Sequence, residues 1–162
     1  MTDEQILKLH EPLPTWAVKP HPVKKNMSSI HPMAIVDRLN EVFGIGLWEY
    51  TVTYISCDKE KQTVKDYSND GATKERTVYM SAVKGRLEVE PFGIILEQFG
   101  GSTNDDKGDS LKGGATDALT KIASYLGIGA SIYKGQGNVS LEGTQPLTEA
   151  FEEPFISHND PI

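Results

Sequence analysis

The stretch GDSLKGGATDALTKIASYLG, residues 108–127, decides how we expect this chain to fold. Asp109 or Ser110 can accept a hydrogen bond from a first-turn N–H, and Gly127 stands where a left-handed residue ends many helices. Gly113 and Gly114 would each weaken an isolated helix by about 1 kcal/mol, so we expect another backbone to approach them closely. Apolar residues spaced by three and four positions predict a buried stripe, made of Leu111, Ala115, Ala118, Leu119, Ile122 and Leu126.

Three segments before this helix predict an antiparallel sheet. Residues 48–55 alternate with a period of two, which places Trp48, Tyr50, Val52 and Tyr54 on one face of a strand. Residues 76–90 and 94–99 predict a second and a third strand, joined by the turn Pro91-Phe92-Gly93. The charged residues 58–75 predict a long exposed hairpin loop, and residues 100–107 predict a loop that leads into the helix.

The N-terminal part adds a second helix and sets the domain boundaries. Residues 31–43 predict an amphipathic helix that ends at Gly44, and residues 16–19 predict a brief strand that ends at Pro20. The predicted fold class is α+β, with a β-β-β-α core in which an antiparallel sheet carries helices on one face. We expect an N-terminal arm in residues 1–15, one domain in residues 16–140, and an acidic, disordered tail in residues 141–162.

The formal net charge of -7 argues at first against a polyanionic partner. However, eight of the 23 acidic residues, and only one of the 16 basic residues, lie in residues 1–13 and 142–162. The central body is therefore neutral, so the net charge does not exclude a basic groove on it. The acidic tail itself predicts a solvated end, with a partner-binding or nucleic-acid-mimicking segment as the alternative.

The sequence lacks the motifs that mark several classes of function. A single cysteine, Cys57, excludes an internal disulfide and predicts a reducing, cytoplasmic setting. No apolar run reaches the roughly 20 residues of a membrane span, so we expect no membrane partner. The sequence contains no dinucleotide fingerprint, Walker A motif or nucleophile elbow, and its four histidines lack metal-ligand spacing. We expect no enzyme activity, no cofactor and no metal.

The basic residues of the central body are the candidate binding residues. Lys84 and Arg86 share one face of the second predicted strand. A basic sheet beside a basic helix can form a groove for a phosphate backbone. The alternative is local pairing, of Lys121 with Asp117 and of Arg86 with Glu88 or Glu90. The candidates are Lys19, Lys24 and Lys25 beside the proline arm, Lys84, Arg86, the loop residue Lys107, and Lys112 and Lys121 on the C-terminal helix.

Two motifs resemble those of a known family. Residues 38–44, RLNEVFG, are followed by Trp48, and residues 115–121, ATDALTK, run on to Leu126-Gly127. Both are similar to motifs of the Rad52 and Rad22 double-strand-break repair proteins, in the same order and with strands between them. The resemblance covers roughly residues 16 to 135.

The resemblance implies a recombination mediator that anneals complementary strands without ATP. Such proteins bind single-stranded DNA in a groove that runs around a ring of subunits. It also implies a homo-oligomer, as a ring or a helical filament, with a single-strand-binding protein as a further candidate partner. The expected member is bacterial or phage-encoded, which implies the cytoplasm of a bacterial or phage-infected host. Lys121 matches a helix cation that holds the DNA backbone, and Lys19 lies about where an arm arginine reaches the groove. Thr120 and Ser124 stand where the family has Lys or Arg, and that departure weakens the expected phosphate clamp.

Two other functions stay open from the sequence. The first is an oligomeric scaffold of the same fold that recruits recombination partners through its acidic tail without annealing DNA. The second is a metal-dependent nuclease that uses Asp105, Asp106 and Asp109. Their spacing is not that of an EF-hand, and a polar loop with a helix cap is favoured over a metal site.

Overall fold

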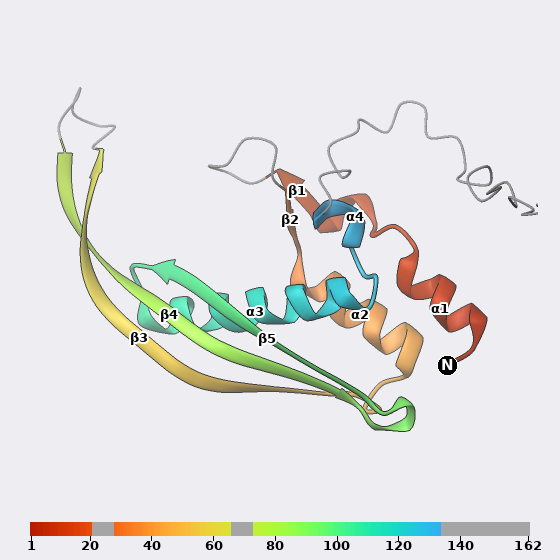
Figure 1. Cartoon of the computed structure of the whole chain (residues 1–162). Helices are drawn as coiled ribbons and strands as arrows, with labels where there is room; N and C mark the ends of the chain where they lie inside the picture. The colour runs from red at the N-terminus through yellow and green to blue at the C-terminus, as the bar shows by residue number, and fades with distance from the viewer. Residues whose placement is uncertain (21–27, 66–72, 134–162) are drawn as a thin grey trace, which may run out of the picture.

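A computed structural model describes residues 1–20, 28–65 and 73–133 of the chain (Figure 1). Its main feature is an antiparallel sheet with the strand order β3-β4-β5. β3 spans Glu49–Lys65, β4 spans Thr73–Val89 and β5 spans Ile94–Asn104. The sheet is strongly curved, and the long helix α3, Lys107–Tyr125, lies along its concave face. The predicted α+β class with antiparallel strands is confirmed.

The smaller elements gather around one end of α3 (Figure 1). α1 spans Asp3–His10 and α2 spans Pro32–Phe43. Between them β1, Val18–Pro20, pairs antiparallel with β2, Ser28–Ile30, after the 3-10 helix η1, Thr15–Ala17. A second 3-10 turn, η2 at Glu90–Phe92, joins β4 to β5, and α4 spans Ala130–Tyr133. The predicted helix over residues 31–43 and the turn at residues 91–93 are confirmed.

Two of the predicted loops are wrong, because the strands continue through them. Residues 58–65 and 73–75 belong to β3 and β4, paired from Asp58↔Met80 to Lys65↔Thr73, while residues 66–72 lie outside the described residues. Residues 100–104 continue β5 opposite residues 79–83. The first extension was not predicted because its residues are mostly charged. A two-stranded ribbon needs no apolar face, so the alternation that predicts a strand is weak there. The second extension was not predicted because it begins with two glycines, Gly100 and Gly101, which are rare inside strands.

The ends of α3 show one error and one confirmation. The N-cap is Asp106, not Asp109 or Ser110: its Oδ1 accepts a hydrogen bond from the Asp109 N–H at 2.9 Å. Ser110 is fully buried instead, and its hydroxyl lies within hydrogen-bond distance of the backbone oxygens of Tyr79 and Ser102. At the other end Gly127 has a φ of 98°, the left-handed conformation expected of it.

The expected close approach at the helix glycines is also confirmed. A Cβ atom on Gly100 of β5 would overlap the Gly114 carbonyl oxygen and lie 2.5 Å from the Ala118 nitrogen. A Cβ atom on Gly113 would lie 2.8 Å from the Ser102 Cβ. The N-terminal half of α3 therefore packs on the sheet backbone to backbone, without large side chains between the two.

The apolar core lies at the opposite end of α3. It combines α1, α2, the C-terminal half of α3 and the end of β4, and contains Leu9, Ile35, Leu39, Val42, Phe43, Leu87, Val89, Leu119, Ile122, Ala123 and Ile128. In the predicted α3 stripe Ala118, Leu119 and Ile122 are buried, whereas Leu111, Ala115 and Leu126 are only half-buried. The segment predicted as an arm, residues 1–15, holds α1, whose Leu9 is part of this core.

Candidate nucleic-acid interface

Lys121 lies where α3 passes the free edge of β5. Its Nζ is 2.7 Å from Asp117 Oδ2 and donates to the Phe99 carbonyl oxygen at 3.3 Å. Asp117 Oδ2 also accepts the Gly101 N–H at 3.1 Å. The predicted local pair is thus confirmed, and it occupies one backbone donor and one acceptor of an edge strand. Both side chains remain more than a third exposed, so Lys121 is within reach of a ligand.

Lys84 and Arg86 share one face of β4, as predicted, but that face is turned away from α3. Gly85, between them, faces Tyr50 and Ala118. Lys84 lies 2.8 Å and Arg86 lies 3.3 Å from Glu97 on β5. Hydrogen bonding by Lys84, and then by Arg86, lowers the pKa of the Glu97 carboxyl despite desolvation.

Arg86 is further held by Glu88, as the local-pairing alternative predicts. The hydrogen bond to Glu88 is the main reason that the pKa of the Arg86 guanidinium is raised, with a smaller part from Glu97. Lys84, Arg86, Glu88 and Glu97 therefore form a charge-balanced cluster on the convex face. A phosphate that contacts these cations must compete with two carboxylates.

The other predicted cations occupy separate places. Lys107 is the first residue of α3, and Lys112 lies further along the same helix; both are exposed. Lys19 is exposed in β1, opposite Ser29 of β2. Within the described part of the chain these three lysines form no ion pair. Lys24 and Lys25 lie outside the described residues. Among the described residues, the predicted cations are therefore not gathered into a single groove.

Sequence reasoning missed the cations that lie on the ribbon beyond the end of β5. It places all of them except Arg76, which begins the second predicted strand, in a loop, where side-chain direction has no periodicity. The signal that could have placed them correctly is alternation, since Lys59 and Lys61 are two residues apart, as on one face of a strand. The ribbon cations are Lys59, Lys61 and Lys65 on β3, and Lys74 and Arg76 on β4.

The acidic residues before α3 have structural partners. Asp106 caps the helix, and Asp105 lies 3.1 Å from Arg76. In residues 1–20, 28–65 and 73–133 there is no group of three or more His, Cys, Asp or Glu side chains that could hold a metal ion. Among the same residues, no helix is long and apolar enough to cross a membrane.

Tyr50 anchors the middle of α3 to β3. Its hydroxyl donates a hydrogen bond of 2.6 Å to the Ala115 carbonyl oxygen. Burial is the main cause that raises the pKa of Tyr50 to about 12, so the donor stays protonated at neutral pH. The helix that carries Lys112 and Lys121 is therefore held in a defined position on the sheet.

Comparison with known proteins places the chain in a family. A search of curated proteins finds no match. The family model described as "Rad52/22 family double-strand break repair protein" matches residues 3–146, which include every residue of both motifs and every candidate cation. The chain therefore belongs to the Rad52/22 family of double-strand break repair proteins, a family of single-strand annealing proteins that bind single-stranded DNA and form oligomers.

Proposed function

We propose that this protein anneals complementary DNA strands without ATP and without a catalytic residue, as an oligomer whose protomers hold one strand together. The observation that carries the proposal is the family match over residues 3–146, which spans every helix and strand of the described fold. The positions of the cations support the oligomer, because Lys19, Lys107, Lys112 and Lys121 are dispersed over β1 and the length of α3 rather than gathered into one clamp.

The physical task of annealing suits such an assembly. Two polyanions approach only when their backbones are partly neutralised, and they pair only when the base edges stay free. A few weak phosphate contacts in each subunit become strong when they repeat along one strand, because each further contact is intramolecular. An acidic protein can therefore bind DNA tightly with few exposed cations in each protomer.

Exposed apolar side chains at both edges of the sheet support contacts between protomers. Val52 and Ile55 are 44% and 48% exposed on β3. Ile95 and Phe99 are 55% and 63% exposed on the face of β5 that is turned away from α3. The patches are different and lie on different strands, so they favour a head-to-tail contact, which yields a ring when it closes and a helical filament when it does not.

The test is annealing of complementary oligonucleotides by the purified full chain, at low salt and without nucleotide. We expect pairing to be accelerated well above the spontaneous rate, together with an assembly larger than a dimer by mass photometry. An oligomer that binds single strands but does not accelerate pairing would contradict the proposal and favour the scaffold function.

Replacing Lys121 with alanine is expected to weaken binding of single-stranded DNA. Each phosphate that is no longer neutralised should reduce the slope of log affinity against log salt by about 0.7.

Replacing Asp117 with asparagine is expected to tighten binding severalfold, because the amide oxygen still accepts the Gly101 N–H while Lys121 loses its counter-charge. Fluorescence anisotropy with a labelled oligonucleotide at several salt concentrations measures both effects.

The Asp117→Asn variant separates a binding role from a structural one. If Lys121 only closes the edge of β5, Asp117→Asn binds like the wild type, and Lys121→Ala changes the melting temperature without changing the salt slope. That pair of results would show that Lys121 does not hold the DNA backbone.

A further inference from the structure

We propose that the ribbon formed by β3 and β4 beyond the end of β5 carries a further contact site for single-stranded DNA. The site is one face of the ribbon, which holds Lys59, Lys61 and Lys65 and is called the lysine face below. This inference rests on the proposed function and adds a surface that lies apart from the cations of α3.

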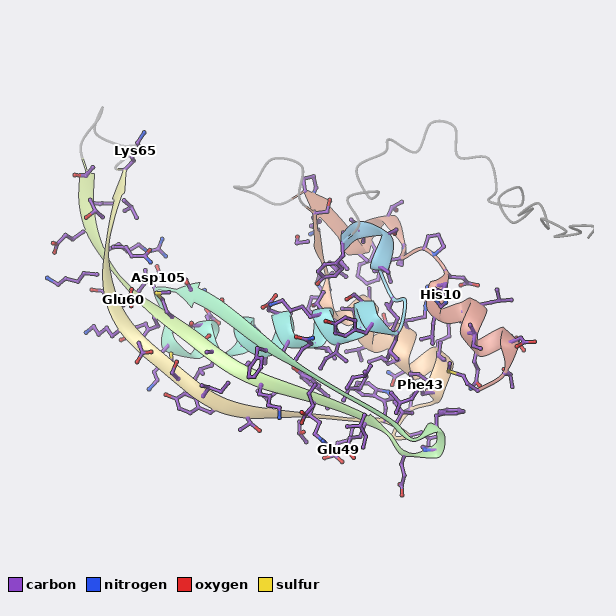
Figure 2. All side chains as sticks on the ribbon, in the orientation of Figure 1. His10, Phe43, Glu49, Glu60, Lys65 and Asp105 are labelled. Atoms are coloured by element: carbon purple, nitrogen blue, oxygen red, sulfur yellow. The ribbon has the colours of Figure 1, made fainter. Side chains whose placement is uncertain are left out.

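Packing does not explain the lysines of the ribbon. β5 ends at Asn104, opposite Tyr79, whereas β3 and β4 stay paired as far as Lys65↔Thr73. Figure 1 shows this part of the hairpin projecting past β5 and α3, and Figure 2 shows Lys65 near its far end, remote from Phe43 in the core. Beyond β5 the packed side chains are the buried Val78 and the half-buried Gln62 and Val64, and these lie on the opposite face, so packing does not account for the lysines.

A β-bulge determines which face receives the lysines. Tyr54 pairs with Val83, but Ser56 pairs with the next residue, Ala82, so Ile55 is an extra residue in β3. Before the bulge the even-numbered β3 residues face α3, as the Tyr50 hydrogen bond shows. After the bulge the odd-numbered β3 residues face α3. Cys57 pairs with Ser81, whose hydroxyl donates a hydrogen bond to the Ser110 carbonyl oxygen on α3.

Without this bulge the ribbon would be inverted. A shift of one residue moves every side chain of a strand to the other face. Asp58 and Glu60 would then continue the α3 side of the sheet, where Lys59 and Lys61 lie now. The extra residue at Ile55 thus places cations, rather than carboxylates, on the face that continues the α3 side of the sheet.

The positive charge of the ribbon is concentrated on this face. The lysine face has three lysines and one carboxylate, Glu75, whose Oε2 is 3.2 Å from Lys61 Nζ. Lys59 and Lys65 have no ion-pair partner among the described residues. The opposite face balances its charges, with Asp58 and Glu60 against Lys74 and Arg76. Charge complementarity therefore selects an anionic partner for one face only.

Aromatic rings and an extended backbone make nucleic acid the suitable anion. Tyr54, 58% exposed, lies on the same side at the base of the lysine face, and the half-buried Tyr79 lies opposite Lys59. Cations interleaved with aromatic rings can hold phosphates while bases stack on the rings. From Lys59 to Lys65 the strand extends about 20 Å, which is a length that several nucleotides of a single strand can follow.

Two double variants of the full chain test the inference. Lys59→Gln with Lys61→Gln removes two charges from the lysine face, and Lys74→Gln with Arg76→Gln removes two charges from the opposite face of the same ribbon. Binding of a labelled oligothymidylate is measured by anisotropy over a range of salt concentrations. We expect the first variant to lose about fivefold or more in affinity and about 1.4 in salt slope, and the control to change less than about twofold.

The outcomes separate this inference from its competitors. Equal losses in both variants would overturn it, because charge anywhere on the ribbon, as a guard against aggregation, would then suffice. A smaller oligomer in the Lys59/Lys61 variant would also overturn it, since the lysines would act between protomers. If the wild type binds the oligothymidylate and the Lys59/Lys61 variant binds it equally well, the lysine face is not a contact site, but the proposed function stands. If the wild type itself does not bind the oligothymidylate, both the proposed function and this inference are wrong.

Discussion

Replacing Gly100 with alanine is expected to lower the free energy of unfolding by about 3 kcal/mol. The new Cβ would overlap the Gly114 carbonyl oxygen and lie 2.8 Å from the Ala118 Cβ. Two of its neighbours, the Gly114 oxygen and the Ala118 nitrogen, are backbone, so no rotamer change can relieve the overlap and α3 must move off the sheet. Urea denaturation followed by circular dichroism measures the loss.

Gly108→Ala is the matched control for this change. It adds the same methyl group in the first turn of α3, 3.2 Å from the Asp106 side chain. Alanine favours a helix over glycine by up to about 1 kcal/mol, while the capping oxygen Asp106 Oδ1 must shift slightly, so this variant should stay within about 1 kcal/mol of the wild type. If Gly100→Ala unfolds at the same urea concentration as Gly108→Ala, the close packing of α3 on β5 is wrong.

The second large effect is expected at Arg38, a buried charge in α2. Its side chain is 7% exposed and donates to the backbone oxygens of Lys8, Glu11 at 3.0 Å and Pro12 at 3.4 Å, and it lies 3.4 Å from Glu41. Arg38→Met keeps much of the volume but leaves these carbonyl oxygens without their donor. We expect a loss of about 3 kcal/mol, with faster proteolysis near residues 8–12.

Lys8→Met is the control for the charge itself. Lys8 also pairs with Glu11 at 3.0 Å and Glu41 at 2.9 Å, but at the surface. An exposed pair of this kind contributes little to stability, so the control should be close to wild type. Equal destabilisation by the two variants would mean that the buried hydrogen bonds of Arg38 add nothing.

Residues 38–44, the motif RLNEVFG, have defined roles in the fold. Arg38 holds the segment after α1, and the Asn40 side chain accepts a hydrogen bond of 2.9 Å from Trp48 Nε1. Phe43 lies in the core, and Gly44 has a φ of 96°, which other residues rarely adopt. The motif that carried the family resemblance therefore reports on the fold, and the residues that contact a ligand stay a prediction.

The sequence by itself determined the features that depend on near neighbours. Helical spacing predicted α2 and α3, period-two alternation placed Tyr50 and Tyr54 on one face, and residue types predicted the turn at Gly93 and the stop at Gly127. These signals are local because a side chain's direction and a glycine's φ depend on the adjacent backbone. The Lys121–Asp117 pair is of the same kind, since one helical turn joins them.

Only the tertiary structure decided where the cations lie relative to one another. The extent of β3 beyond Cys57, the bulge at Ile55 and the burial of Ser110 each depend on a partner strand or helix that is distant along the chain. Lys84 and Arg86 face away from α3 because Gly85 and Gly100 let the helix pack on the other side. Charge and spacing along the chain carry no record of such distant pairing, because it is the packing of whole elements that selects each face.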